Sequence, residues 1–189
     1  MFSAKTYAAR RNMLRTKIGS GIVLFPGNPL SPNNYPNNAY YFRRFVVPLL
    51  FRLNIPSLAG LIDADTGEEA LYGDDFTVED IIWTGPQPTL RELGAKVGIA
   101  ATHPLSELEK RLRKAISLGR KIHFLPPYRG ETKLWLSSLL GIKPTLLHDY
   151  KSVDLMFAVA EMREKKSAEE VEGDGARIPN RLQDDTRWP

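Results

Sequence analysis

The sequence predicts an α/β domain built on a mixed β-sheet. Two observations support this prediction: short apolar runs of strand length alternate with amphipathic stretches of helical length, and two of the strands are joined by a tight turn. A hairpin pairs its strands antiparallel, whereas a helix between two strands favours parallel pairing, so both orientations are expected in the sheet. No segment of the chain repeats another.

The composition narrows the class of protein. The chain has 189 residues, of which 42% are apolar and 25% charged, as is usual for a globular domain with a core. It contains no cysteine, which excludes a disulfide framework and a thiolate site and permits a cytoplasmic location. No apolar run has the length of a membrane span or of a secretory signal. The net charge of +4 is modest, and without an aromatic-and-basic motif we expect neither nucleic acid nor membrane as a partner.

The first part of the chain is expected to form a helix, a buried strand, a loop and a second strand. Lys5–Ile18 has apolar residues at helical spacing, and the basic residues between them are expected on its solvated face. Those basic residues are Arg10, Arg11, Arg15 and Lys17. Ile22–Phe25 is apolar throughout, as in a strand covered on both sides. Pro26–Asn38 is rich in Pro and Asn and predicts a loop, after which Tyr40 to Phe42 begin the next strand.

The stretch Leu58–Pro86 is expected to organise the fold. Leu58–Ile62 and Ala70–Tyr72 are predicted strands, and Asp65-Thr66-Gly67 supplies the turn, because glycine adopts positive φ without steric cost. Thr77 and Asp80 have the spacing of a capping box at the start of a short helix that ends at Trp83-Thr84-Gly85-Pro86. Everything else is expected to pack around this hairpin.

The second half alternates helices and strands. Expected helices are Leu90–Lys96, Pro104–Leu118, Thr132–Leu140 and one capped by Ser152, and expected strands are Val97–Ala101 and Lys121–Leu125. In the second of these helices, the predicted apolar stripe is Leu105, Leu108, Leu112 and Ile116, with Glu107–Arg111 and Glu109–Arg113 as ion pairs. After Ser152, the residues at core spacing are Val153, Met156, Phe157 and Ala160. Ser167 and Glu170 form a capping box for a further helix.

Few residues suggest chemistry. His103, His123 and His148 do not have metal-ligand spacing, and we interpret each as a hydrogen-bonded structural or surface histidine. Asp63 and Asp65 alternate on a strand and could ligate a hard cation, but beside Thr66-Gly67 they are expected to shape the turn and face water. Asp74-Asp75 are expected near the positive end of a helix. The residues alone therefore indicate an α/β domain without a self-contained active site.

The order of these motifs resembles the N-terminal domain of aminopeptidase P (Xaa-Pro aminopeptidase), in the creatinase–prolidase family. The resemblance rests on the run Asn38-Ala-Tyr-Tyr-Phe-Arg43, the hairpin, and Asp80-Ile-Ile-Trp-Thr-Gly-Pro86, and a lysine-serine-acidic phrase within Glu161–Glu170 extends it. It covers the chain from Ala4 to Val171 in order. It implies a creatinase-like three-layer domain with a mixed sheet of about five to six strands flanked by helices.

The resemblance also implies an activity. Family members remove an N-terminal residue that precedes proline, using two metal ions, usually manganese, that activate a water molecule. The metal ligands belong to the C-terminal catalytic domain, so no catalytic residue and no metal ligand is assigned to this chain. The first domain supports oligomer assembly and walls the substrate cleft. Trp83 resembles a tryptophan that borders a neighbouring subunit's active site, and the alternative is that it fills the edge of the core. Tyr41 and Arg43 fall in the family's Tyr-x-Phe-Arg phrase, where Arg43 is expected to fix the loop rather than touch substrate.

Two segments depart from the family pattern in a way that suggests reading-frame slips. One permissible back-translation from Phe45 onward, read one base later, gives SSFLYCSG, which is similar to the family's phrase. Glu172 to Asp185, treated in the same way, gives REMERAYRIGYKM, a plausible amphipathic helix. Our hypothesis is that both segments are translated out of frame, through gene decay or sequencing error. Arg44–Leu53 would then place a proline and arginines where a core strand belongs, so we expect reduced stability. Restoring the family phrase should raise the melting temperature.

The expected domain organisation follows. Residues 1–150 are predicted to form the aminopeptidase-P-like domain, 151–172 a linker helix toward a catalytic domain that the chain lacks, and 173–189 a disordered tail, read out of frame under the hypothesis above. The leading function is that of a non-catalytic first domain, inactive alone. A free-standing oligomerisation module that pairs with itself or with full-length peptidase subunits is the alternative.

Overall fold

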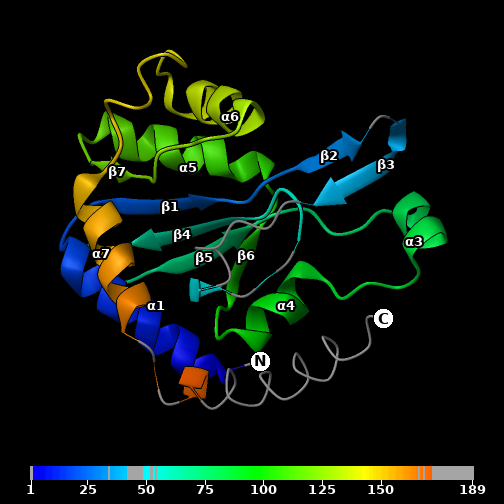
Figure 1. Cartoon of the computed structure of the whole chain (residues 1–189), viewed down its shortest axis with the longest axis horizontal. Helices are drawn as coiled ribbons and strands as arrows, with labels where there is room; N and C mark the ends of the chain where they lie inside the picture. Colours follow the sequence, from blue (N-terminus) through cyan, green and yellow to red (C-terminus); the bar gives the residue numbers. More distant parts are fainter. Residues whose placement is uncertain are drawn as a thin grey trace, which may run out of the picture.

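Figure 1 shows the computed structural model of the chain as a three-layer arrangement with a sheet in the middle. It describes residues 2–33, 35–41, 49–51, 53, 55–165, 167 and 169–171. The main sheet has five strands within these residues, in the order β6-β5-β4-β1-β7. They are β1 (Ile22–Pro26), β4 (Ala59–Asp63), β5 (Glu69–Tyr72), β6 (Ala101–His103) and β7 (Ile122–His123). This confirms the predicted α/β class and the mixed sheet.

The hairpin lies at the centre of the sheet, as predicted. Strand β4 pairs antiparallel with both β1 and β5, and Leu61 stands between Leu24 on one side and Ala70 on the other. The outer pairs are parallel: β7 lies beside β1, and β6 beside β5. Gly67 has φ 79°, so the turn uses the conformation that glycine allows. The hairpin therefore sets the register of strands on both of its sides.

Each face of the sheet has its own core. Along β1 the side chains alternate: Val23 and Phe25 join the cluster under α1 (Ala4–Ile18), α4 (Leu90–Lys96) and α7 (Val153–Glu164). Ile22 and Leu24 join the cluster under α5 (Ser106–Ser117) and α6 (Gly130–Leu140). All five residues of β1 are buried, which explains why its sequence is apolar throughout.

Helix α1 forms where predicted, but Arg11, one of the four basic residues expected on its solvated face, is not solvated. The Arg11 side chain is completely buried. Its guanidinium donates to the Glu69 carboxylate at 2.7 Å and to the backbone carbonyls of Leu50 and Val97, both at 3.0 Å. Spacing within one helix predicts a solvated position for Arg11, because it contains no information about distant segments. The acceptors of Arg11 come from such segments and are supplied only by the tertiary packing.

The other helices agree with the sequence in extent and partly in orientation. In α5, Leu108 and Leu112 are buried as predicted, together with Ala115, whereas Ile116 is exposed. The Glu109–Arg113 ion pair is present, but Arg111 binds Asp63 and Glu68. Gly119 follows α5 with φ 72°, as expected of a C′ residue. Residues 97–98 form a turn, so the strand expected there begins later, at Ala101.

Helix α7 is capped by Ser152, whose hydroxyl accepts from the Leu155 amide, but it is rotated relative to the prediction. Its buried residues are Leu155, Ala158 and Val159. Val153, Met156 and Phe157, which we expected in the core, are exposed. The sequence carries two apolar faces on this helix, and the spacing alone could not decide which of them the domain buries.

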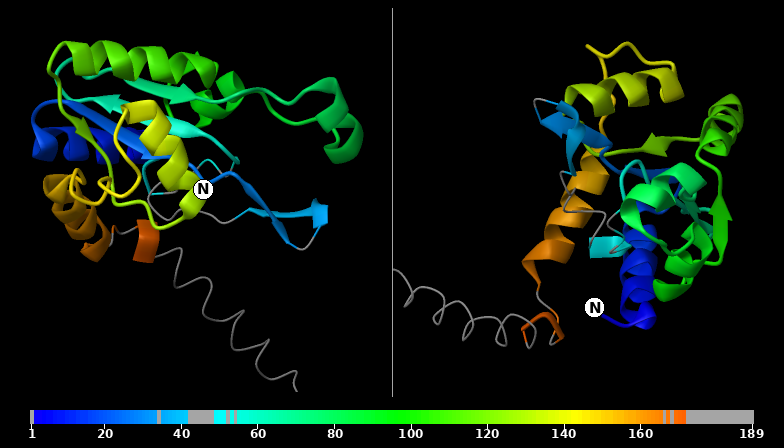
Figure 2. Two further views of the ribbon diagram at one scale, coloured as in Figure 1. Left: turned by 90° about the horizontal axis from the view of Figure 1, so that it is seen from above. Right: turned by 90° about the vertical axis from the view of Figure 1, so that its right-hand side faces the viewer.

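The segment predicted as a loop at 26–38 contains a two-stranded ribbon. Strands β2 (Leu30–Asn33) and β3 (Tyr35–Tyr41) pair antiparallel with an irregularity between Pro32 and Asn33. Tyr40 and Tyr41 therefore end a strand rather than begin one. The ribbon extends from the end of β1 away from the main sheet (Figure 2). Proline and asparagine are tolerated here because the ribbon is not a central strand.

Part of the suspected out-of-frame segment reaches the core. Leu50, Phe51 and Leu53 are buried, and the Phe51 and Phe25 rings meet edge-on with centroids 5.9 Å apart. A Cβ on Gly60 would lie 2.6 Å from the Phe51 ring, so a larger residue in β4 would force this ring to move. Residues 44–48 and 52 of this segment, and 173–189 of the tail, lie outside the described residues. The frame-slip hypothesis stays a prediction.

Among the described helices, none combines the length and the apolar character that a membrane crossing requires.

Candidate functional site

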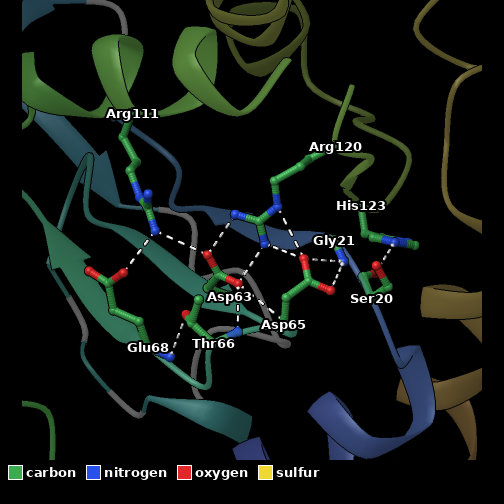
Figure 3. Close-up of polar contacts among 9 residues, drawn as sticks. All are labelled: Ser20, Gly21, Asp63, Asp65, Thr66, Glu68, Arg111, Arg120 and His123. Carbon is green, nitrogen blue, oxygen red and sulfur yellow. Dashed lines mark hydrogen bonds and ion pairs between the residues drawn. The ribbon is translucent and has the colours of Figure 1, made fainter. Parts of the chain in front are cut away.

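The largest polar cluster lies at the β4–β5 turn and centres on Asp63 (Figure 3). One Asp63 oxygen accepts from the backbone amides of Asp65 and Thr66, at 3.1 Å each, and so shapes the turn as predicted. Arg120, which follows α5, binds Asp63 through two nitrogens at 2.6 and 2.8 Å. Arg111 of α5 reaches the same carboxylate at 3.0 Å and also Glu68 at 2.8 Å.

The surroundings of Asp63 correct one expectation. Asp63 is fully buried and does not face water. Hydrogen bonds from Arg120 and from the turn amides lower the pKa of its carboxyl from 3.8 to about 2, although burial acts in the opposite direction. Asp65 is exposed, and it also binds Arg120. A guanidinium thus occupies the place where a cation would bind, so this cluster fixes the turn to α5 and does not fit a metal ion.

The histidines behave as structural groups. His123 is buried in β7, with Nε2 3.1 Å from the carbonyl oxygen of Ser20 and Nδ1 2.6 Å from the Ser152 hydroxyl. Since a carbonyl only accepts, Nε2 carries the proton and Nδ1 accepts from Ser152. Burial lowers the pKa of His123, which keeps the ring neutral. His103 stacks on Tyr72 and lies 3.4 Å from Glu107. Within the described residues, no three side chains of His, Asp or Glu gather as a metal site.

The acidic pair after β5 serves helix ends, as its sequence suggested. The Asp75 carboxylate accepts from the Leu90 amide at 2.6 Å, at the start of α4. Asp74 accepts from the Leu105 amide at 3.1 Å, immediately before α5. Both carboxylates therefore lie at the positive ends of helices that follow later in the chain, not at the helix nearest to them in sequence.

That nearest helix, α3 (Val78–Thr84), is the most exposed apolar element of the described structure. It has the predicted capping box: the Thr77 side chain accepts from the Asp80 amide, and the Asp80 carboxylate accepts from the Thr77 amide at 2.8 Å. Figures 1 and 2 show α3 at the end of an extended segment, away from the sheet. Trp83 is 83% exposed, Val78 77% and Ile82 75%. Trp83 therefore does not fill the edge of the core, and the alternative reading of this residue is wrong.

The other two predicted site residues are described less fully. Tyr41 ends β3 and pairs with Leu30 of β2. Arg43 lies outside the described residues. Tyr41 lies on β3 and Trp83 on α3, and the roles of Tyr41, Arg43 and Trp83 stay predictions.

A small apolar cavity of about 220 Å³ lies between the end of β1 and the N-terminal ends of α5 and α6. Its walls are Gly27, Pro29, Ser57, Leu105, Glu131, Thr132 and Trp135. The cavity is large enough for one apolar side chain or ring. Glu131, its only carboxylate, already interacts with Arg129 at 3.3 Å. Sequence reasoning missed it because its walls come from four separate segments.

Comparison with known proteins gives the family. The family model described as "Aminopeptidase P, N-terminal domain" matches residues 7–125, which is more than half of the chain. The chain belongs to this family. The match includes the hairpin, α3 with Trp83, and the Asp63–Arg120 cluster, and it ends just after β7. A search of curated protein sequences finds no match.

Solved structures confirm the fold of the aminopeptidase P N-terminal domain. Aminopeptidase P from E. coli, in its low-pH form, is similar with a TM-score of 0.73 and 18% identity over 91% of this chain. Proline aminopeptidase P II from Yersinia pestis gives a TM-score of 0.71 and 18% identity over 90%. Aminopeptidase PepP from Pseudomonas aeruginosa gives 0.72 and 17% over 90%. The chain spans only 41%, 41% and 40% of these three chains.

Proposed function

We propose that this chain acts as the non-catalytic N-terminal part of an Xaa-Pro aminopeptidase, a manganese-dependent hydrolase that removes the residue before proline. Support comes from the family match and from Asp63, Asp75 and His123, which are engaged with Arg120, the start of α4 and Ser152. In this proposal the metal-binding half belongs to the remainder of the longer proteins. The chain alone neither cleaves Xaa-Pro peptides nor binds manganese tightly, and the absence of cysteine favours a cytoplasmic location.

The observation that carries the proposal is the exposure of α3. Trp83 lies on a capped helix, so its backbone is already ordered. Its indole is 83% exposed and offers a large apolar surface, and a partner that binds it loses little additional conformational entropy. We propose that α3 walls the substrate cleft of a neighbouring subunit, with Trp83 in contact with the bound peptide. Tyr41 and Arg43 belong to the same proposed cleft wall, with Arg43 in a supporting role.

A fusion protein tests this function. The present chain would replace the corresponding N-terminal part of E. coli aminopeptidase P, and manganese-dependent release of the residue before proline would be measured. We expect the fusion to be active and Trp83→Ala to lower kcat/KM about tenfold, which corresponds to the loss of one aromatic contact. Leu118→Ala, at another exposed apolar residue, is the matched control and should leave kcat/KM unchanged. Equal activity of the Trp83→Ala and parent fusions would contradict the role of α3.

A second candidate function is a free-standing oligomerisation module. The exposed apolar residues of α3 favour it, because isolated apolar surface of this kind promotes association. Light scattering of the purified chain separates the two: a strict monomer at high protein concentration speaks against the module. A stable oligomer that dissociates on Trp83→Ala would favour it.

A further inference from the structure

Helix α7 has two apolar faces, and the domain uses only one of them. Leu155, Ala158 and Val159 point into the core beside α1. Val153, Met156 and Phe157, spaced i, i+3 and i+4, form a second stripe on the outer side, which we call the outer stripe. Phe157 is 73% exposed and Val153 50%. A helix that is apolar on both sides is typical of an element covered on both sides.

Two acidic residues next to the outer stripe are already paired within the domain. Asp154 lies 3.4 Å from Lys121, and Glu161 lies 2.6 Å from Lys17 of α1. These two carboxylates are therefore partly neutralised, and the stripe itself suits an apolar protein surface. The helix is also held in a fixed orientation, because Ser152 caps it and is itself hydrogen-bonded to His123 of β7.

The position of α7 in the chain identifies its occupant. It is the last of the long helices described, and it follows residues 7–125, which match the model of an N-terminal domain. The similar E. coli, Yersinia and Pseudomonas chains extend well beyond it, since about 41% of their length is matched. Figures 1 and 2 place α7 and α3 at opposite ends of the molecule, so the two exposed surfaces can serve different partners.

We propose that the outer stripe of α7 is the docking surface for the domain that follows it in the longer proteins, and that α7 is therefore an interdomain element rather than a free linker. The inference rests on the proposed function, because it takes the partner to be the metal-binding half of the same polypeptide. Apolar packing on Val153, Met156 and Phe157 would then set the angle between the two halves.

The experiment compares the same substitution in two proteins. Phe157→Ser and Met156→Ser are introduced together into the present chain and into its fusion with the remaining part of E. coli aminopeptidase P. In the chain alone the exposed stripe has no partner, so the melting temperature should change by less than about 2 °C. In the fusion we expect a fall of at least about 4 °C and a split of one transition into two. Leu134→Ser, at a residue of α6 that is 65% exposed, is the control and should be neutral in both proteins.

Three results would overturn the inference: an equal effect of the substitutions in both proteins, two independent transitions in the unsubstituted fusion, or a dimer of the chain alone that the substitutions convert to a monomer. The last result would assign the stripe to a second copy. Failure of the docking inference can be distinguished from failure of the proposed function. A fusion that unfolds as one unit and responds at α7, but cleaves no Xaa-Pro peptide, would refute the function and keep the docking surface.

Discussion

Helices α5 and α7 have the same length, but their apolar residues are arranged differently and the fold treats them differently. Both span 12 residues. Helix α5 buries most of the stripe that its sequence predicts, and the opposite side carries charges such as the Glu109–Arg113 pair. Helix α7 buries a different stripe from the predicted one and leaves the predicted one exposed. A helix with one apolar side has a single way to pack, whereas a helix with two needs a further partner to satisfy both.

The same contrast separates the two ends of the sheet. The β4–β5 turn holds buried charge, and every member of the Asp63 cluster in Figure 3 has a partner. At the other end, α3 holds apolar side chains that are largely exposed. We infer that the Asp63 end is complete within this domain and that the α3 and α7 surfaces are made for other parts of an assembly. Four predictions test this distinction.

The largest effect is expected at Arg11, in the helix on which α7 lies. Replacing Arg11 by Ala leaves two buried backbone carbonyls and Glu69 without their donor, and we expect a loss of about 3–5 kcal/mol in the free energy of unfolding. Denaturant unfolding followed by circular dichroism measures it. Arg113→Ala, which removes only the exposed ion pair, should cost about 0.5 kcal/mol or less. A similar loss of unfolding free energy at both arginines would show that the burial of Arg11 does not increase its contribution to stability.

Truncating single side chains on the buried sides of α5 and α7 and on the outer stripe of α7 tests the comparison between the two helices. Leu155→Ala in α7 and Leu108→Ala in α5 remove fully buried side chains, and each should destabilise the chain by about 3 kcal/mol. Phe157→Ala, on the exposed side of α7, should stay within about 0.5 kcal/mol. All three are measured by chemical denaturation of the chain alone. A large cost at Phe157 would mean that the outer stripe is already covered in the isolated chain.

The Asp63 cluster should make the free energy of unfolding depend on pH in the acid range. The folded-state pKa of Asp63, about 2, lies below its unfolded value near 3.8, so the native state binds fewer protons. The stability that the ionised Asp63 carboxylate contributes is present in full above about pH 4 and is lost as the pH falls toward 2. The loss should be about 1–2 kcal/mol after allowance for solvent around the arginines. Stability measured across this range should fall less steeply for Asp63→Asn than for the parent chain. Parallel curves would indicate that the cluster does not couple folding to this carboxyl.

The smallest effect is expected at the cap of α3. Thr77→Ala removes the hydroxyl that accepts from the Asp80 amide and should cost this helix about 1 kcal/mol. Since the apolar side chains of α3 are largely exposed, hydrogen exchange should become faster in α3 while the global unfolding free energy stays the same. A drop in global stability would show that α3 is folded together with the core.

Much of the fold could be predicted because its signals are local. The turn at Gly67, the capping boxes at Thr77 and Ser167, and the C′ glycine after α5 all depend on neighbours within a few residues. The errors arose where a residue's role depends on distant segments. Arg11 receives acceptors from residues 39 to 86 positions away. Asp63 is bound by arginines 48 and 57 positions away, so its burial was not visible in the spacing of the turn.

The family was predicted correctly, whereas the roles of the site residues stay predictions. The phrase that ends at Gly85-Pro86 indicated the family and singled out Trp83 as a site candidate. It could not say whether the indole is buried or exposed, since that depends on whether any other segment packs on α3. The frame-slip hypothesis for Arg44–Leu53 also stays a prediction, although Leu50 and Phe51 contribute to the core.

The sequence by itself determined the α/β class, the central hairpin, the positions of most helices and the family, because periodicity, turn residues and caps act over short distances. Only the tertiary structure decided which side of α7 is inside, that Arg11 and Asp63 are buried, and that Trp83 is exposed. Burial is a property of how segments far apart in the chain come together, and a one-dimensional pattern specifies the faces of an element without specifying which of them will be covered.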